Sequence, residues 1–244
     1  MTANAPRVAV IGFPGSNGDH DALHSLANDV GVDATLLDYR ETSLAGVDAV
    51  VLPGGFSYGD ALRAGAIARF APIMEAVKTF AASGGPVLGI CNGFQVLTEA
   101  HLLPGALLKN RTLRFHCHTT HIRVENARSF WIGGLRAGDI LTLPIAHGEG
   151  SYFVDEETLK RLEAGNQIAF RYVERDGSLT DEANLNGSVS AIAGVTNEQG
   201  NVLGLMPHPE RATNSLVGAT DGMRILGTLL ALESSSSAGI ARAS

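Results

Sequence analysis

Pro86-Val-Leu-Gly-Ile-Cys-Asn-Gly-Phe-Gln95 is the stretch that decides the fold prediction. Val87–Ile90 has the length and branching of a buried strand, and the apolar residues after Gly93 recur at the spacing of a helix. Cys91 therefore lies at the turn between them. Such a sharp bend crowds the backbone two residues away on either side, which favours glycine at Gly89 and Gly93. The sequence predicts a nucleophile elbow, a strand-to-helix turn that presents a reactive side chain.

Cys91 is predicted to be a nucleophile because the following helix begins beside its sulfur, where the positive end of the helix dipole stabilises a thiolate. The alternative is a buried structural cysteine beside a helix-packing glycine, since free cysteine is often a small core residue. The pattern alone leaves both interpretations open.

Length and composition indicate a globular α/β protein with one large domain or two small ones. The chain has 244 residues, of which 45% are hydrophobic, enough for a sizeable core. Its net charge of −7 is spread along the sequence, which argues against nucleic acid or an anionic membrane as a partner. Two cysteines, no leader sequence and no apolar stretch of about 20 residues predict a cytoplasmic protein. The serine-rich residues 234–244 are expected to form a disordered tail.

The order of the predicted segments indicates a mostly parallel open sheet flanked by helices, with some antiparallel strands. Strands are expected at Arg7–Gly12, residues 34–37, 47–52, Val87–Ile90, 111–124, Ile140–His147, Ile192–Thr196 and 202–206. Besides the elbow helix, helices are expected at residues 19–30, 61–70, 72–82, 155–162 and 218–233. Asn17 or Asp19 is expected to cap the first helix. Residues 171–188 contain two turn signals and are expected to form a hairpin or surface loop.

A second unusual stretch, Val51-Leu-Pro-Gly-Gly-Phe-Ser-Tyr-Gly-Asp60, ends a buried strand in a glycine loop. Ligands bind at the carboxyl ends of parallel strands, and such a loop exposes backbone donors. The N–H groups of Gly55 and Asn92 are therefore predicted to form an oxyanion hole. The alternative is an ordinary glycine turn at a strand end.

The glycine turn at residues 13–18 resembles a phosphate-binding loop only superficially. No Gly-Lys-Ser/Thr follows it, and Gly-x-Gly-x-x-Gly is absent. The sequence therefore argues against nucleotide binding at this turn.

Four potential metal ligands lie close together at His116, Cys117, His118 and His121. Alternation along a strand places Cys117 on the face opposite His116 and His118, and no second ligand pair with zinc-like spacing follows. We expect solvent-facing histidines and no metal.

The general base is predicted to come from one of two His-x-Glu pairs at strand ends. Pro207 and Pro209 hold the backbone extended around His208, so that His208 and Glu210 point the same way and form a base with its orienting carboxylate. His147 and Glu149 have the same spacing, but glycines make their loop flexible and better suited to contacting a substrate or partner. Because the prolines restrain it, we favour the pair at His208.

Five stretches in register carry a resemblance to a known family. Besides the elbow, the five stretches are Phe13-Pro-Gly-Ser-Asn17, Pro53-Gly-Gly-Phe-Ser-Tyr-Gly-Asp60, Gly65-Ala-Ile-Ala-Arg-Phe70, His147-Gly-Glu-Gly150 and Met206-Pro-His-Pro-Glu-Arg211. Together they resemble the glutaminase subunits of phosphoribosylformylglycinamidine synthases, which are triad-type glutamine amidotransferases of flavodoxin-like fold. The match runs from about Arg7 to Leu232, which implies a single domain at residues 7–233. Gly18 departs from it, because cysteine is expected there in many relatives.

The resemblance implies a reaction in which Cys91 attacks the side-chain amide of glutamine and forms a glutamyl thioester. His208 and Glu210 complete the triad. Gly54, Phe56 and Gln95 are implied as glutamine contacts, and the His147–Glu149 loop as a contact with substrate or partner.

The resemblance also implies partners, because ammonia released into water would be lost and this chain shows no acceptor site. A large synthase subunit is expected to bind ATP, magnesium and formylglycinamide ribonucleotide, with a small bridging subunit; no cofactor is expected in this chain. The alternatives are a stand-alone cysteine hydrolase or peptidase of similar fold, and an inactive binding module.

Overall fold

The computed structural model describes residues 5–125 and 128–232, and its centre is a nine-stranded sheet in the order β2-β1-β3-β4-β11-β10-β9-β6-β7. The first five strands of that order are parallel to one another. Their bounds are β2 Asp33–Asp38, β1 Arg7–Gly12, β3 Ala49–Leu52, β4 Val87–Ile90 and β11 Val202–Leu205. The middle strands β3, β4 and β11 are buried on both faces, as their continuous apolar sequences predict.

The remaining four strands are antiparallel to their neighbours. They are β10 Ile192–Thr196, β9 Ile168–Val173, β6 His116–Val124 and β7 Ile140–His147. A separate two-stranded antiparallel sheet pairs β5 Ala106–Leu108 with β8 Ser151–Phe153. The predicted fold class is confirmed as a mixed sheet with parallel core strands, although its antiparallel part is larger than expected.

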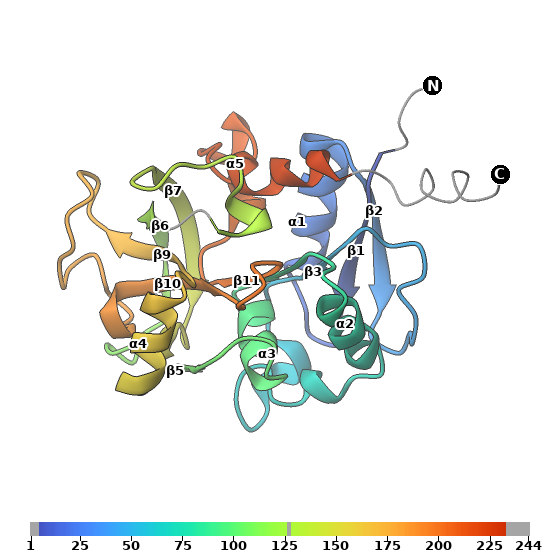
Figure 1. Cartoon of the computed structure of the whole chain (residues 1–244), viewed down its shortest axis with the longest axis horizontal. Helices are drawn as coiled ribbons and strands as arrows, with labels where there is room; N and C mark the ends of the chain where they lie inside the picture. The colour runs from blue at the N-terminus through green and yellow to red at the C-terminus, as the bar shows by residue number, and fades with distance from the viewer. Residues whose placement is uncertain (1–4, 126–127, 233–244) are drawn as a thin grey trace.

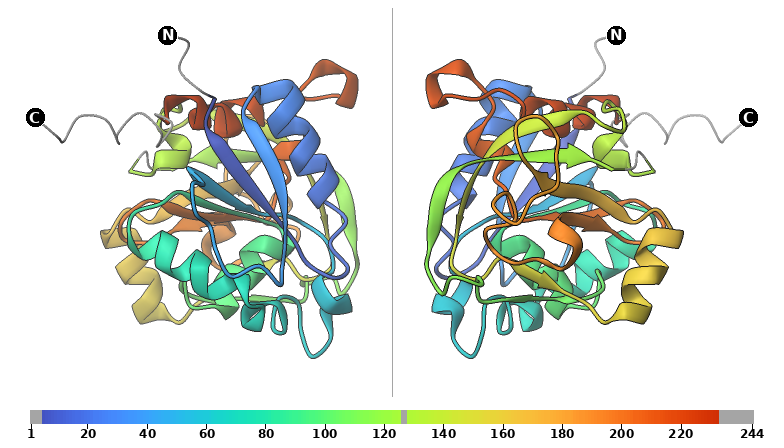
Figure 2. Two further views of the ribbon diagram at one scale, coloured as in Figure 1. Left: turned by 90° about the vertical axis from the view of Figure 1, so that its right-hand side faces the viewer. Right: turned by 90° about the vertical axis from the view of Figure 1, so that its left-hand side faces the viewer.

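Helices cover both faces of the sheet (Figures 1 and 2). On one face lie α1 Asp19–His24, which continues as a π-helix to Val30, and α5 Met223–Leu226. On the other lie α2 Ile73–Ala82, α3 Asn92–Glu99 and α4 Glu156–Ala164. Short 3₁₀ turns occupy Ser57–Asp60, Ala68–Phe70, Phe130–Ile132, Val189–Ala191, Pro209–Arg211, Ser215–Val217 and Gly227–Ala231. Across the described ranges, no helix has the length and hydropathy to cross a membrane.

Two predicted helices are wrong in extent. Within residues 61–70 only Ala68–Phe70 is helical, because Gly65 has a φ of 79° and its backbone lies directly against the elbow helix. The helix predicted at residues 218–233 begins only at Met223, since Gly218 has a φ of 104°. Its last predicted residue and the predicted tail, residues 233–244, lie outside the described part of the chain.

Two smaller predictions also fail. The first helix has Gly18 at its N-cap and no side-chain cap, so neither Asn17 nor Asp19 has that role. The predicted loop at residues 171–188 begins inside strand β9, where Tyr172 is fully buried. The turn signals in that stretch identified the loop correctly but could not show how far the strand extends into it.

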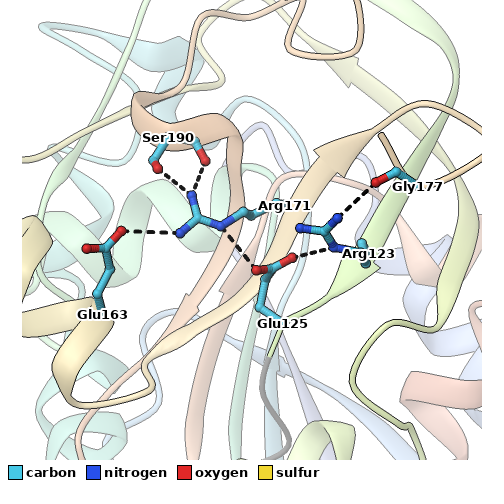
Figure 3. A network of polar contacts seen from close by, with 6 residues as sticks. All are labelled: Arg123, Glu125, Glu163, Arg171, Gly177 and Ser190. Carbon is cyan, nitrogen blue, oxygen red and sulfur yellow. Dashed lines mark hydrogen bonds and ion pairs between the residues drawn. The ribbon is translucent and has the colours of Figure 1, made fainter. Parts of the chain in front are cut away.

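A network of ion pairs and hydrogen bonds holds this loop in place (Figure 3). Glu125 accepts from Arg123 at 2.7 Å and from Arg171 at 3.3 Å, which links β6 to β9. Arg123 also donates to the carbonyl of Gly177, and Arg171 to the carbonyl of Ser190. The loop between β9 and β10 is thus held at its turn and at its far end.

Candidate active site

Cys91 lies at the junction of β4 and α3, near the carboxyl ends of the parallel strands. Its backbone has φ 51° and ψ −104°, a conformation that a non-glycine residue rarely adopts and that costs about 1–3 kcal/mol. Its N–H donates to the carbonyl of Leu205 at 2.8 Å, and its side chain is 5% exposed. The strand-to-helix turn predicted from the sequence is therefore present, with the strain that an elbow requires.

Both elbow glycines are needed because a side chain at either position would collide with neighbouring atoms. A Cβ on Gly93 would lie 2.0 Å from the carbonyl oxygen of Leu52 on β3. A Cβ on Gly89 would lie 2.5 Å from Leu97 Cδ1 and 2.7 Å from the Gly93 carbonyl. At Gly89 the crowding therefore arises partly across the bend itself, and at Gly93 it comes from the neighbouring strand.

His208 and Glu210 form a buried pair, with Nδ1 and Oε1 2.6 Å apart. The side chains are 2% and 1% exposed. Only His208 is extended, with φ −104° and ψ 91°; Pro209–Arg211 form a 3₁₀ turn that brings the carboxylate to the imidazole. The predicted convergence is present, but the extended chain expected through Glu210 is not.

The electrostatic surroundings of His208 stabilise its protonated form. Burial alone lowers the pKa of His208, but the charges of Glu210 and Cys91 and their hydrogen bonds outweigh it and raise the pKa to about 10. Because Nδ1 faces Glu210, Nε2 is the nitrogen left for Cys91, and within the described chain it has no other partner. The pair is arranged as a base with an orienting carboxylate.

Gly54 leaves space for this arrangement. A Cβ on Gly54 would lie 2.8 Å from His208 Cε1 and 3.6 Å from Cys91 Cβ. Gly18 in turn packs against Gly54, to whose carbonyl its N–H donates at 3.1 Å. The position that departs from the family pattern therefore supports the loop beside the nucleophile.

The loop at Gly54 and Gly55 leaves a backbone N–H group free to donate a hydrogen bond to a ligand. Gly55 has a φ of 140° and pairs with Ser16 in an isolated bridge. Within residues 5–125 and 128–232, the backbone N–H groups of Gly55 and Asn92 donate no hydrogen bond. The Asn92 side chain accepts from the N–H of Ser57 at 3.1 Å and so ties the loop to the elbow. Two backbone donors are thereby left beside Cys91.

A cavity of about 90 Å³ lies over Cys91, between this loop and the loop at residues 146–149. Phe56 lines it, is 45% exposed and stacks on Phe115 with ring centroids 6.4 Å apart. Gln95 lines it too, but its amide accepts from Asn92 at 2.8 Å and donates to the Glu149 carbonyl at 2.6 Å. Gln95 therefore joins the elbow helix to the facing loop.

The second His-x-Glu pair lies at the same cavity but in a different chemical environment. Asn110 donates through Nδ2 to the carbonyls of Arg114 and His147, so its Oδ1 is the atom that accepts from His147 Nδ1 at 3.1 Å. Burial, together with the charge of His208, lowers the pKa of His147 to about 3. The imidazole is neutral, and Glu149 makes no ion pair with it among the described residues.

Three supporting residues were missed from the sequence. Asn110 is fully buried and also accepts from the N–H of Gly150, so it holds the whole loop that follows β7. Asp60 lines the cavity, and burial and the charge of Glu149 raise its pKa to about 6. The Asn92 side chain is the third. Asp60 had a signal as the last residue of the glycine-loop motif and Asn92 as part of the elbow, whereas nothing in the sequence marks Asn110.

The histidines of β6 have local partners. His116 hydrogen-bonds Thr112 at 2.8 Å, and His121 hydrogen-bonds Thr142 at 3.1 Å. Cys117 and His118 are exposed, whereas His116 and His121 are half-buried rather than solvent-facing. In the part of the chain that the structure describes, no group of three metal-ligating side chains comes together.

Comparison with known proteins gives consistent results. The model of the CobB/CobQ-like glutamine amidotransferase domain matches residues 5–221. Phosphoribosylformylglycinamidine synthase subunit PurQ of Thermomicrobium roseum is 58% identical over 93% of this chain and 96% of the relative. Phosphoribosylformylglycinamidine synthase subunit PurQ of Methanosarcina acetivorans is 53% identical over 91% of this chain and 96% of the relative.

Solved structures agree with this. PurLQS from Thermotoga maritima contains a chain with a TM-score of 0.82 and 39% identity, covering 93% of this chain and 98% of that one. Another glutamine amidotransferase from Thermotoga maritima has a TM-score of 0.53 and 16% identity, covering 85% of this chain and 77% of that one. This shows a shared fold alone.

Proposed function

We propose that this chain, which belongs to the family of CobB/CobQ-like glutamine amidotransferase domains, is the glutaminase subunit of phosphoribosylformylglycinamidine synthase in purine biosynthesis. The observation that carries the proposal is the strained Cys91 elbow facing the buried His208–Glu210 pair, in a chain similar to PurQ over nearly its whole length. The same observation argues against an inactive binding module, because all three triad side chains are present and converge.

In the proposed reaction, Cys91 and His208 start as a thiolate–imidazolium pair, in which His208 already holds the thiol proton, and the sulfur attacks the side-chain amide carbon of glutamine. The carbonyl oxygen becomes an oxyanion, which the N–H groups of Gly55 and Asn92 stabilise. Removal of one such donor typically costs about 100- to 1000-fold in rate. The N–H groups left on both sides of Cys91 support this assignment.

His208 then returns the proton to the amide nitrogen, the C–N bond breaks, and ammonia leaves a glutamyl thioester on Cys91. Water attacks the thioester while His208 takes its proton, and the C–S bond breaks to give glutamate and the free thiol. Glu210 holds the imidazole with Nε2 toward the sulfur throughout and stabilises its charge.

The ammonia needs an acceptor outside this chain, because amide transfer to formylglycinamide ribonucleotide requires ATP. The relative from Thermotoga maritima is named as part of PurLQS. We propose that this chain likewise associates with a large synthase subunit, which binds ATP and magnesium, and with a small bridging subunit. The chain itself uses no cofactor, and we place the complex in the cytoplasm.

The test is glutamate release from L-glutamine by the purified chain, with and without the two partner subunits. We expect weak activity alone, stronger activity in the complex, and none in Cys91→Ala. Equal activity in both states would contradict coupling. A chain that cleaves other amides but not glutamine would be a stand-alone hydrolase instead.

A further inference from the structure

A second and larger cavity lies at the edge of the sheet opposite Cys91. Its volume is about 610 Å³, against about 90 Å³ for the cavity over the nucleophile, and none of the described residues lines both. Ala82 precedes strand β4, Gln167 precedes β9 and Gln199 precedes β11, and these three strands run in the same direction. The larger cavity therefore lies at their amino ends, whereas Cys91 follows the carboxyl end of β4. The proposed reaction makes no use of it.

The floor of this cavity is apolar. Ala81 at the end of α2, Leu103 after α3 and Leu162 of α4 line it and are buried. These three helices cover the same face of the sheet (Figure 1). Cavities of about 300–1,000 Å³ with a largely apolar lining are typical of small-molecule sites. The size and the floor of this one therefore suit a ligand as large as a nucleotide.

Basic side chains predominate among the charged residues of the lining. Lys78 of α2 and Arg161 of α4 line the cavity, and Glu198 is the one acidic residue among the described residues that do so. Lys78 pairs at 2.8 Å with Glu75, which is 79% exposed. Arg161 pairs at 3.6 Å with Glu157, which is 84% exposed. Ion pairs this exposed contribute little stability, so both cations can exchange them for an anionic ligand.

The helix ends at the cavity do not oppose an anion. Helices α2 and α3 both end there, and the carbonyl groups at the carboxyl end of a helix carry partial negative charge. The Ala81 carbonyl accepts from Asn201 Nδ2 at 2.8 Å, and the Leu97 carbonyl accepts from the N–H of Leu102 at 3.0 Å. His101, just after α3, adds a third basic side chain to the lining. These carbonyl groups are thus already hydrogen-bonded, and the basic side chains determine the charge of the cavity.

Two glutamines on the wall beside the strands supply further hydrogen-bonding groups. Gln167 donates through Nε2 to the carbonyl of Thr196 at 3.0 Å, and within the described ranges no donor reaches its Oε1. Gln199 is exposed, and its amide makes no hydrogen bond to another described residue. Side-chain amides of this kind bind the donors and acceptors on the edge of a nucleobase.

We propose that this cavity binds a nucleoside monophosphate. The phosphate pairs with Lys78 and Arg161 through charge-assisted hydrogen bonds, and the rings pack on the apolar floor. Gln167 and Gln199 contact the edge of the base. Because the two cavities share no described lining residue, the bound nucleotide leaves the cavity over Cys91 open to glutamine.

The test is isothermal titration calorimetry of the full-length chain with AMP and with GMP, each compared with its nucleoside, which lacks the phosphate. Lys78→Ala and Arg161→Ala each remove one cation. Lys160→Ala is the matched control, because Lys160 is on α4, pairs with Glu156 and lies outside the cavity. Ala82→Phe adds bulk to the cavity from an exposed lining position and changes no charge.

We expect at least one nucleotide to bind about tenfold or more tightly than its nucleoside. Lys78→Ala and Arg161→Ala should each weaken that binding about 10- to 100-fold, since each removes a hydrogen bond to a charged group. Ala82→Phe should abolish it, and Lys160→Ala should match the wild type. Absence of binding by both nucleotides, equal binding of nucleotide and nucleoside, or wild-type affinity in both cation variants would overturn the proposal.

A second titration tests whether this site is separate from the active site. Cys91→Ala, which lacks the nucleophile, is titrated with the nucleotide in the presence and in the absence of saturating L-glutamine. The same dissociation constant under both conditions supports the proposal. Loss of nucleotide binding in the presence of glutamine would place the nucleotide over Cys91 and would contradict it.

Discussion

The two His-x-Glu pairs have the same spacing, both follow a strand, and both lie close to Cys91, yet their histidines have opposite electrostatics. The pKa of His208 is raised to about 10, whereas the pKa of His147 is lowered to about 3. Both imidazoles are almost fully buried. Burial therefore cannot account for the difference.

The difference comes from the backbone that follows each histidine. After His208, a 3₁₀ turn begins at Pro209 and brings Glu210 to Nδ1 at 2.6 Å. After His147, the loop runs through Gly148, and the neutral side-chain amide of Asn110 accepts a hydrogen bond from His147 Nδ1 instead. An imidazole beside a carboxylate is stabilised as a cation, and one beside an amide stays neutral when buried.

The comparison shows that the His-x-Glu spacing identifies candidate base–carboxylate pairs, and that the hydrogen-bond partner of Nδ1 determines which histidine can act as the base. Glu149 lines the cavity together with Asp60 and is not the partner of His147 Nδ1. One pair is thus suited to proton transfer and the other to shaping the site. Each of the following predictions tests this division.

The largest expected effect is on the orienting carboxylate. Glu210→Gln should lower kcat about 10⁴-fold, because the imidazole loses the carboxylate that fixes its tautomer and stabilises its charge. Glu149→Gln should act chiefly on KM and lower kcat less than tenfold. Steady-state glutaminase kinetics of the complex would measure both. A similar loss of kcat in the two variants would contradict the division.

The next largest effect is on the support of the neutral histidine. Asn110→Ala should reduce the free energy of unfolding by about 3 kcal/mol, since it leaves His147 Nδ1 and the Gly150 N–H buried without a partner. Chemical denaturation would measure it, with exposed Asn28→Ala as the control. A loss below about 1 kcal/mol would show that Asn110 does not hold this loop.

Gly54→Ala tests the space around the charged histidine. The new methyl group would meet His208 Cε1 at 2.8 Å and displace the ring from the sulfur, for an expected loss of about 100-fold in kcat. Gly134→Ala, where a Cβ meets nothing within 4 Å, is the control. Wild-type kinetics in Gly54→Ala would mean that the ring tolerates a shift.

The two histidines should also give opposite pH dependences of stability. Unfolded histidine titrates near 6.5, so buried neutral His147 makes the fold lose stability as pH falls from about 6.5 towards 3, by up to about 1.4 kcal/mol per unit. His208 stabilises the fold fully below about 6.5, and this contribution is lost as pH rises towards 10. The free energy of unfolding is to be measured across pH for the wild type, His147→Gln and His208→Gln. The difference between wild type and His147→Gln should increase with pH, and the difference between wild type and His208→Gln should decrease. Parallel slopes would refute the assignment.

The sequence predicted the parallel half of the sheet and the elbow well, because their signals are local. Apolar runs such as Val87–Ile90 are buried on both faces, and the elbow glycines mark the turn itself. The reason given for those glycines was incomplete, since Gly93 also accommodates Leu52, which lies on the neighbouring strand. A local sequence pattern cannot show which residues from distant parts of the chain pack against it.

The parts that failed depend on distant contacts. The helix expected at residues 61–70 is replaced by turns because Gly65 packs on the elbow helix, and Asn110 is important only because the fold brings it to His147. The candidate pairs could be found from spacing, but the choice between them required the partner of each Nδ1. That partner is set by tertiary structure.

The most direct test of the central claim compares the rate constant for glutamate release in His208→Asn and His147→Gln, each assembled with the partner subunits and shown to be folded by thermal melting. If His208 is the base, His208→Asn should lose about 10³-fold or more, and His147→Gln less than tenfold. An inactive His147→Gln beside an active His208→Asn would contradict the account and assign the relay to the other pair.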